Sequence, residues 1–428
     1  MSIRHTAPEI KEPVEFDLRL PMCEKITLKN GVELYYLNKG TEETLQISWV
    51  FYAGSWNEEA NLVAATTNFM LKNGTTKHNA FEINEHFEYY GAYLNRSCYS
   101  ETSEITLHCL SKHVDHLLPM VEEIITDASF PQEELDIFKQ NSQQRLKVNL
   151  QKSDFVAGRL IDAQLFGEKH PYGRYSMPED YAALEREQLV RFHNENYRHG
   201  HCVIFVAGNI PENLLKRMEE IFGALPLQPH RKHRSTIEHP IVRATQKKTF
   251  LQNDPNGVQA AIRIARPFPN RHHPDFQKAA VLNNLFGGFF GSRLMANIRE
   301  DKGYTYGIYS YMMNTIRESG WIISTEAGRD VMEATIKEVY NEMEALREEP
   351  VDEEELQMTR NYMIGAILGD LDGPFQVISR WRSLVLNGLT EDYFYKGIQT
   401  IKTVTAEELH ELAQRYLQPD EFYELTVV

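Results

Sequence analysis

The sequence has no long apolar run, because no stretch approaches the ~20 apolar residues that a membrane-spanning helix requires. Its opening residues, Met-Ser-Ile-Arg-His-Thr-Ala-Pro-Glu-Ile-Lys-Glu-Pro, also lack the apolar centre of a signal peptide. We therefore expect a soluble, cytoplasmic protein with no membrane partner.

Cysteine is scarce, and its few positions are scattered. The chain has four cysteines, and no two of them form a C-x-x-C pair: Cys23, Cys98, Cys109 and Cys202. A disulfide framework and a thiolate zinc site both depend on closer or more regular spacing. Reduced and mostly buried thiols are therefore expected.

Positive charge is in deficit. The 45 lysines and arginines are outnumbered by 61 aspartates and glutamates, which gives a formal net charge of -16. This balance argues against nucleic acid and against an anionic membrane surface as the main partner. With 25% charged and 42% hydrophobic residues, the remaining composition is that of an ordinary globular protein.

The chain is longer than one hydrophobic core usually serves, since it has 428 residues. Its second half repeats features of the first half in the same order. Phe130–Leu135 opens a long helical tract and is matched by Pro350–Leu356, and Glu179–Tyr181 is matched by Glu391–Tyr393. The distance along the chain between each segment and its match is too long for a solenoid repeat and indicates two tandem homologous domains.

The seam between the two copies is the stretch 226–248, which is rich in Pro, His, Arg and Lys. We therefore predict an N-terminal domain at 1–225, a linker at 226–248 and a C-terminal domain at 249–428. In each half, strands and hairpins are interleaved with paired helices. This order predicts an α+β fold in which a mixed or antiparallel sheet carries helices on one face.

Hydrophobic periodicity places the elements of the first half. The predicted strands are Ile26–Leu37 about an Asn30-Gly31 turn, Leu45–Tyr52, Tyr93–Cys98, Glu104–Leu110 and His201–Ala207. The predicted helices are Ala60–Leu71, Ala80–Tyr90, His113–Asp127, a long tract at Gln132–Phe166, Glu187–Tyr197 and Glu212–Ala224.

A glycine-rich loop leads into a short helix in the second half, within Phe286–Tyr306. Ser292 is placed to cap that helix, and Gly303 is placed to end it in a left-handed conformation. The expected apolar side of the helix consists of Leu294, Met295 and Ile298, and a strand is expected at Tyr304–Tyr311.

Arg299 then ends the helix, and Tyr306 begins the strand beside it. A guanidinium and a phenol held at such a junction can both donate hydrogen bonds to a peptide carbonyl or a developing oxyanion without changing protonation state. The alternative is that Arg299 belongs to a surface ion pair and that Tyr306 is an ordinary strand tyrosine. Spacing alone favours this structural alternative.

The segments Gly291–Leu294 and Ile298–Tyr306 carry a resemblance to a known family. The chain resembles the pitrilysin/insulinase family of zinc peptidases, in particular the processing-peptidase-like branch, over nearly its whole length from about Leu18. The resemblance implies two α+β domains per subunit. It also implies that Arg299 and Tyr306 contact the backbone of a peptide substrate near the zinc ion.

The catalytic motif of that family, H-x-x-E-H, is missing. Its chemistry requires two neutral imidazoles on adjacent helical turns to hold zinc, and a glutamate to take a proton from the metal-bound water. The corresponding helix lies in Asn61–Thr75. The motif positions are filled by Ala64, Thr67 and Asn68 or, one residue later, by Ala65, Asn68 and Phe69.

The family's third zinc ligand, an acid on the long helix, is missing as well. Phe138–Leu146 contains no acid, and Arg145 lies near the ligand position, where its charge would repel zinc. Other histidines occur only in pairs without a third ligand nearby, as His113 with His116, His199 with His201, and His272 with His273. We therefore predict no bound metal, no cofactor and no peptidase activity of the chain alone.

Three functions remain open. In the first, the chain is a non-catalytic subunit that supplies Arg299 and Tyr306, across a shared chamber, to a homologous partner carrying H-x-x-E-H. Alternatively, it holds unstructured peptides without cutting them, or it is a purely structural subunit of a larger complex.

Overall fold

The computed structural model of the chain describes residues 11–232, 237–313 and 315–428. The chain divides into two compact units, and each unit combines segments from distant parts of the sequence. Unit 2 contains Met22–Ala244 and Gly373–Arg382, and unit 1 contains Thr245–Asp372, Ser383–Val428 and the described part of Met1–Pro21. The passage between units at Ala244 falls inside the 226–248 stretch, of which residues 233–236 lie outside the described residues.

Unit 2 is built on a seven-stranded mixed sheet with the order β1-β2-β6-β3-β5-β4, to which the short strand β7 adds beside β6. β6 runs parallel to β2 and β7, and the other neighbours are antiparallel. The central strands β3 and β6 are buried along almost their whole length. The strands are β1 Glu24–Thr27, β2 Glu33–Asn38, β3 Thr44–Phe51, β4 Tyr93–Cys98, β5 Ser103–Leu110, β6 His201–Gly208 and β7 Gln228–Pro229.

Most helices of unit 2 share one apolar core with this sheet. At its centre the ring of Trp49 lies 5.0 Å from that of Phe222, and Phe51 lies 4.9 Å from Tyr197. The α-helices are α1 Val63–Met70, α2 Ala80–Tyr89, α3 Val114–Asp127, α4 Gln132–Asn149, α5 Ser153–Phe166, α6 Pro178–Ala183, α7 Arg186–His193 and α8 Leu214–Ile221. Shorter helical turns are η2 Ser55–Asn57, η3 Ser111–His113, η4 Asn194–Arg198, η5 Phe222–Ala224 and η6 His230–Lys232.

Unit 1 contains a five-stranded sheet with the order β10-β11-β9-β12-β8. Only the β12–β8 pair is parallel. The outer strand β10 has its free edge covered in part, because the Ile308 N–H donates to Met295 Sδ at 3.4 Å. The strands are β8 Lys248–Leu251, β9 Gln259–Phe268, β10 Thr305–Met312, β11 Ser319–Gly328 and β12 Tyr423–Val427.

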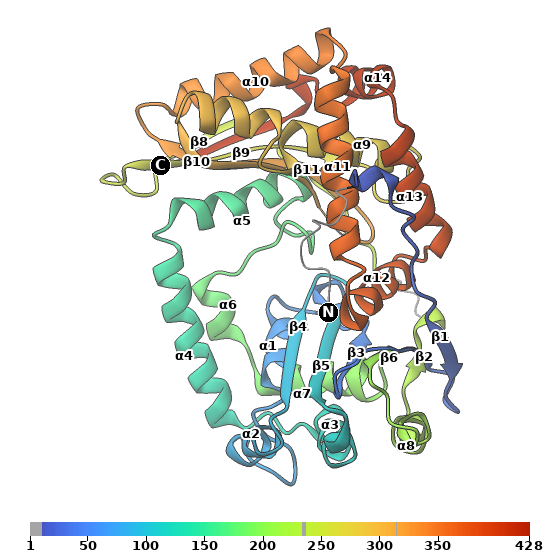
Figure 1. The fold of residues 1–428 in the computed structure, drawn as a ribbon. Coiled ribbons are helices and arrows are strands. Elements are labelled where there is room, and N and C mark those ends of the chain that lie inside the picture. The colour runs from blue at the N-terminus through green and yellow to red at the C-terminus, as the bar shows by residue number, and fades with distance from the viewer. Residues whose placement is uncertain (1–10, 233–236, 314) are drawn as a thin grey trace, which may run out of the picture. The chain divides into compact units, whose positions relative to one another are not determined.

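Helix α10 lies on one face of this second sheet (Figure 1). The helices of unit 1 are α9 Phe276–Asn283, α10 Met332–Glu348, α11 Glu353–Gly369, α13 Glu391–Thr403 and α14 Ala406–Tyr416. Helix α12, Pro374–Leu386, begins in unit 2 and ends in unit 1. The shorter segments are η1 Pro13–Glu15, η7 Asn284–Gly288, η8 Met295–Asp301 and η9 Pro419–Glu421.

The N-terminal segment is tied to helices that come much later in the chain. The side chain of Asn361 in α11 donates to the Glu12 carboxylate at 2.5 Å. The Lys402 ammonium in α13 donates to the Phe16 carbonyl oxygen at 2.9 Å. These contacts explain why this segment belongs to unit 1 although the residues that follow it belong to unit 2.

The predicted α+β class is confirmed, with a sheet and covering helices in each unit. The predicted elements of the first half are all present, but the long helical tract is two helices, because α4 ends at Asn149 and α5 begins at Ser153 (Figure 1). Between them, tight turn bonds join Gln151 N–H to Val148 and Lys152 N–H to Asn149. No helix within the described ranges is both long and apolar enough to cross a membrane.

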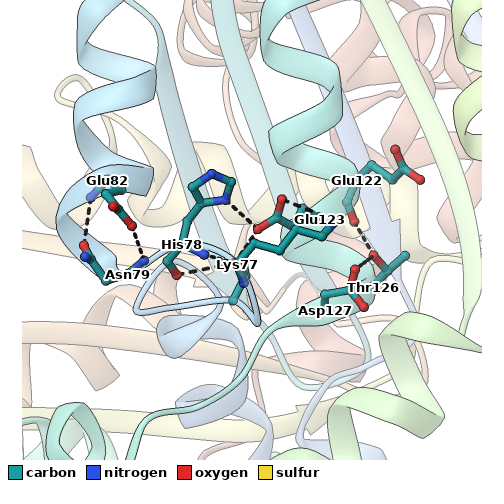
Figure 2. Close-up of polar contacts among 9 residues, drawn as sticks. Lys77, His78, Asn79, Glu82, Glu122, Glu123, Thr126 and Asp127 are labelled. Atoms are coloured by element: carbon teal, nitrogen blue, oxygen red, sulfur yellow. Dashed lines mark hydrogen bonds and ion pairs between the residues drawn. The ribbon is translucent and has the colours of Figure 1, made fainter.

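The loop between α1 and α2 is fixed to α3 by one buried carboxylate, Glu123 (Figure 2). Glu123 accepts a hydrogen bond from Thr75 Oγ1, lies 2.8 Å from His78 Nδ1 and lies 3.9 Å from Lys77 Nζ. Burial by itself raises the pKa of Glu123, but these hydrogen bonds and neighbouring positive charges outweigh it and hold the pKa below its ordinary value of 4.5. The carboxylate form therefore stabilises the loop.

Glu123→Gln is expected to lower the free energy of unfolding by about 1–3 kcal/mol near neutral pH, since the loop loses hydrogen bonds to a charged group. The pKa of Glu123 is lower in the folded state, so its contribution is present above pH 4.5 and is lost as pH falls through the folded value. Urea unfolding at about pH 7 and about pH 3 should therefore show a smaller cost at the lower pH. Glu122→Gln is the matched control, and an equal cost of Glu123→Gln at both pH values would contradict the assignment.

Candidate functional site

The glycine-rich segment folds largely as its sequence predicts. Leu294, Met295 and Ile298 are all buried, and Gly303 ends the helix with φ at 65°. The closing bonds are Gly303 N–H to the Arg299 carbonyl at 3.2 Å and Tyr304 N–H to the Ile298 carbonyl at 3.0 Å. The helix itself, η8, is a π-helical turn rather than an α-helix. Such turns are frequent at functional sites.

The predicted cap by Ser292 is wrong. Its hydroxyl is buried and has no hydrogen-bond partner among the described residues, whereas its backbone carbonyl accepts from Ala296 N–H at 2.9 Å. The backbone of this loop, rather than the serine side chain, therefore begins the helix.

The loop before η8 is held rigidly on two sides. A Cβ atom at Gly287 would lie 2.7 Å from the Cβ atom of Ser310, so only glycine permits this approach to β10. On the other side, the Phe289 ring stacks on Tyr362 of α11 with centres 4.4 Å apart. Arg293 adds a bidentate ion pair to Glu355, with distances of 2.7 and 2.8 Å.

Arg299 and Tyr306 lie together at the junction of η8 and β10. The Arg299 Cζ atom is 5.5 Å from the centre of the Tyr306 ring. Tyr306 is 91% exposed, so it does not pack as an ordinary strand tyrosine. A bulge in the β10–β11 pairing between Thr305 and Ile308 interrupts the alternation of side chains here. The Tyr306 ring therefore lies in solvent beside the guanidinium of Arg299, whose side chain is 27% exposed.

The structural alternative for Arg299 also has support. Arg299 Nη1 lies 3.2 Å from Glu300 Oε1, and the Glu300 side chain is 53% exposed. The Arg299 side chain is 27% exposed, so the pair is partly exposed. Such a pair contributes on the order of 1 kcal/mol or less and engages only one of the guanidinium nitrogens. Among the described residues, no other ion pair or hydrogen bond engages the side chains of Arg299 and Tyr306. Most of their donors are therefore available to a ligand.

The first set of motif positions on α1 faces the core. Ala64 and Thr67 are fully buried, and Asn68 is 2% exposed. The Thr67 hydroxyl donates to the Val63 carbonyl at 2.7 Å, and the Asn68 amide donates to the Tyr197 hydroxyl at 3.1 Å. Only the later alignment places two motif positions, Ala65 and Phe69, on the exposed face of the helix.

Phe69 and its neighbours occupy the place where the resemblance puts zinc. The Phe69 ring packs on Phe138 of α4 with centres 4.8 Å apart. The Arg96 guanidinium lies 5.4 Å from the Phe69 ring and donates to the Phe69 carbonyl. Burial lowers the pKa of Arg96 to about 10, and burial together with Arg96 lowers the pKa of Lys72 to about 8. Arg145 is exposed on α4.

These residues do not fit a zinc ion. An aromatic ring, an alanine and an arginine offer none of the nitrogen, oxygen or thiolate donors that zinc prefers. Within the described ranges, no group of three or more His, Cys, Asp or Glu side chains is arranged to hold a metal. Three of the six histidines considered earlier make other contacts: His113 and His116 contact the Tyr90 ring, and His201 Nδ1 lies 2.9 Å from the Pro229 carbonyl.

Replacing Ala64, Thr67 and Asn68 with the motif residues His, Glu and His is expected to give no peptidase activity. The new side chains would enter the core, where overpacking and buried charge should lower the free energy of unfolding by more than about 3 kcal/mol. The matched variant, Ala65→His with Asn68→Glu and Phe69→His, places two histidines at the surface but still lacks a third ligand. Circular dichroism, zinc analysis after dialysis and a peptidase assay check both variants, and an active enzyme from either would contradict this account.

The start of α1 depends on a buried ion pair that sequence reasoning missed. Glu58 Oε2 accepts from Ala64 N–H at 2.8 Å, and Arg174 pairs with the other carboxylate oxygen. Burial raises the pKa of Glu58 to about 7, although Arg174 opposes that shift. The carboxylate also supports Leu62, which has the uncommon φ of 73°. The partners are 116 residues apart, so no local pattern could reveal them.

Two family models match adjoining parts of the chain. The model described as insulinase (peptidase family M16) matches residues 35–174, and the model described as peptidase M16 inactive domain matches residues 183–363. Among curated relatives, the uncharacterized zinc protease YmxG of Bacillus subtilis is 24% identical over 409 residues, which is 93% of this chain and 97% of the relative. The non-peptidase homolog YmxG of Helicobacter pylori is 23% identical over 307 residues, which is 69% and 68% of the two chains.

Solved structures show the same fold. A crystal structure of a peptidase M16 inactive domain from Pseudomonas fluorescens has a TM-score of 0.84 at 21% identity and covers 95% of this chain and 98% of its own. A protease from Helicobacter pylori has a TM-score of 0.85 at 16% identity and covers 96% and 100% of the two chains.

Proposed function

Because this chain belongs to the insulinase family (peptidase family M16), and because its helix α1 carries no histidine or acid, we propose that it is a non-catalytic subunit of a heterodimeric zinc peptidase. A homologous partner with an H-x-x-E-H motif supplies the zinc chemistry. This chain binds an extended peptide through Arg299 and Tyr306 and completes the partner's active site. A cytoplasmic location is part of the proposal.

One observation carries the proposal: the zinc-motif positions of the first half carry no histidine or acid, whereas the second half has an arginine and a tyrosine in contact where the resemblance implies substrate binding. The motif positions of α1 are apolar or buried, and they are surrounded by packing contacts rather than by metal donors. By contrast, Tyr306 is exposed, and the Arg299 side chain, which is 27% exposed, makes one ion pair, to Glu300, and lies beside two aromatic rings. A protein kept only for its scaffold has no need to hold such a pair of donors together at the junction of η8 and β10.

The Arg299–Tyr306 pair also supports a second function, the holding of unstructured peptides without cleavage, because peptide binding requires no metal. Peptide binding by the chain alone, with no partner in the cell, favours this second function. A structural role in a larger complex predicts tight assembly without any peptide binding.

Affinity purification from the native cell followed by mass spectrometry tests the proposal. The expected result is a stoichiometric homologue that contains H-x-x-E-H, and co-expression of the two chains is expected to give zinc-dependent peptidase activity that neither chain has alone. A partner without the motif, or full activity of the partner by itself, would overturn the proposal.

A further inference from the structure

An exposed phenylalanine, Phe290, lies over the arginine of the proposed site. The centre of its ring is 4.7 Å from Arg299 Cζ, which is closer than the 5.5 Å between that atom and the Tyr306 ring. Phe290 is 59% exposed, so burial in the core does not explain its position. An aromatic ring at this distance attracts a guanidinium through its negatively polarised face.

The adjacent phenylalanines have different surroundings. Phe289 is buried to 8% exposure against α11, whereas Phe290 points out of the same rigid loop. A Cβ atom at Gly291 would lie 2.8 Å from the Phe289 ring, so a larger residue at this position would displace that buried ring. The loop thus holds the Phe290 ring at a fixed place beside Arg299.

We propose that Phe290 is a positioning residue of the peptide site, because its ring limits the orientations of the Arg299 guanidinium and keeps the in-plane N–H groups directed toward a bound peptide. Arginine has many rotamers, and Glu300 competes for the same guanidinium at 3.2 Å. A ring over the guanidinium removes part of this freedom before the peptide arrives, which improves affinity. This inference rests on the proposed function and adds one residue to its site.

The test is a double-mutant cycle on the full chain. The probe is fluorescein-labelled, reduced and carbamidomethylated α-lactalbumin, which is permanently unfolded, and its dissociation constant is measured by fluorescence anisotropy. The variants are Phe290→Leu, Phe290→Trp, Arg299→Ala and the double variant with Phe290→Leu and Arg299→Ala. Phe250→Leu is the matched control, because Phe250 is 62% exposed in the same unit. Melting temperatures are measured on the same preparations.

Phe290→Leu is expected to weaken binding about two- to fivefold, and Phe290→Trp to bind as tightly as Phe290 or more tightly. In the Arg299→Ala background, Phe290→Leu should have no further effect, because the ring acts through the guanidinium. A purely structural role would instead lower the melting temperature and would not be rescued by tryptophan.

Different results would contradict the proposed function and the role of Phe290. Unchanged binding by Arg299→Ala, or no binding by the unmodified chain, would reject the proposed function and the inference with it. If Arg299→Ala weakens binding, two results would reject the role of Phe290 alone. The first is unchanged binding by Phe290→Leu, and the second is an equal loss of affinity from Phe290→Leu with Arg299 present and with Arg299 replaced by alanine.

Discussion

Replacing Arg299 with alanine, or Tyr306 with phenylalanine, is expected to lower the turnover of the assembled peptidase by about 100-fold, because each removes a preorganised hydrogen-bond donor. The donors act on the scissile carbonyl or on the peptide backbone beside it. Tyr306 is 91% exposed, and the one ion pair of Arg299 is to Glu300, whose side chain is 53% exposed, so neither change should greatly disturb the fold. Melting temperature, complex mass and turnover are measured on the same preparations.

Two further variants sharpen this experiment. Arg299→Lys should not restore turnover, since an ammonium lacks the planar fork of donors and its stacking on the neighbouring rings. Arg415→Ala is the matched control, because Arg415 is another arginine at a helix end with an ion pair, at 2.6 Å to Asp275. If all variants keep normal turnover, or if turnover falls only in proportion to the folded protein, the shared-site mechanism is wrong.

Arg174→Met is expected to lower the free energy of unfolding by about 3–5 kcal/mol at alkaline pH, because it leaves the buried Glu58 carboxylate without its partner. The side chain of Glu58 is only 2% exposed, and the same carboxylate caps the start of α1. Loss of the pair should therefore loosen the first turn of α1 together with the strained backbone at Leu62.

The cost of Arg174→Met should grow with pH. The folded pKa of Glu58 is about 7, above its ordinary value of 4.5, so the stability that this group contributes is present at low pH and decreases as pH rises through that window. In the Arg174→Met variant, the pKa of Glu58 in the folded state is higher still. The free energy of unfolding of the variant therefore continues to decrease above about pH 7, by up to about 1.4 kcal/mol per pH unit.

Urea unfolding of the unmodified protein and of Arg174→Met, at about pH 6 and about pH 8.5, tests this expectation. The difference between their free energies of unfolding should be about 2 kcal/mol larger at the higher pH. Glu58→Gln separates the effects of charge and cap, because glutamine can still accept from Ala64 N–H but cannot ionise. Its unfolding free energy should lose the pH dependence that Glu58 contributes. A pH-independent cost of Arg174→Met would show that the pair is not ionised in the native protein.

Local sequence patterns predicted the helices and strands well, because the signals that begin and end them depend on neighbouring residues. The Asn30-Gly31 turn, the helix stop at Gly303 and the strand at Tyr93–Cys98 each depend on residues within a few positions. The long tract from Gln132 to Phe166 was misjudged because its helical periodicity continues on both sides of the break at Leu150, and no glycine or proline marks it.

The site was predictable only in part. The missing zinc donors could be read directly from the sequence, and so could the proximity of Arg299 and Tyr306 across one turn. The direction in which α1 faces could not be settled, because two alignments of the motif differ by one residue and only tertiary packing decides which side chains are buried. The Phe290 contact and the Glu58–Arg174 pair depend on loop geometry and long-range contacts that periodicity does not report.

The segment around Glu12 and Phe16 also constrains how the chain reaches its native state. Its partners Asn361 and Lys402 are 349 and 386 residues away in the sequence. During synthesis, this segment therefore leaves the ribosome long before the residues that it contacts. Unit 2 likewise requires Gly373–Arg382. Each unit therefore includes contacts that can form only after residues far along the chain have been synthesised, and such long-range contacts are expected to form late and slowly in folding.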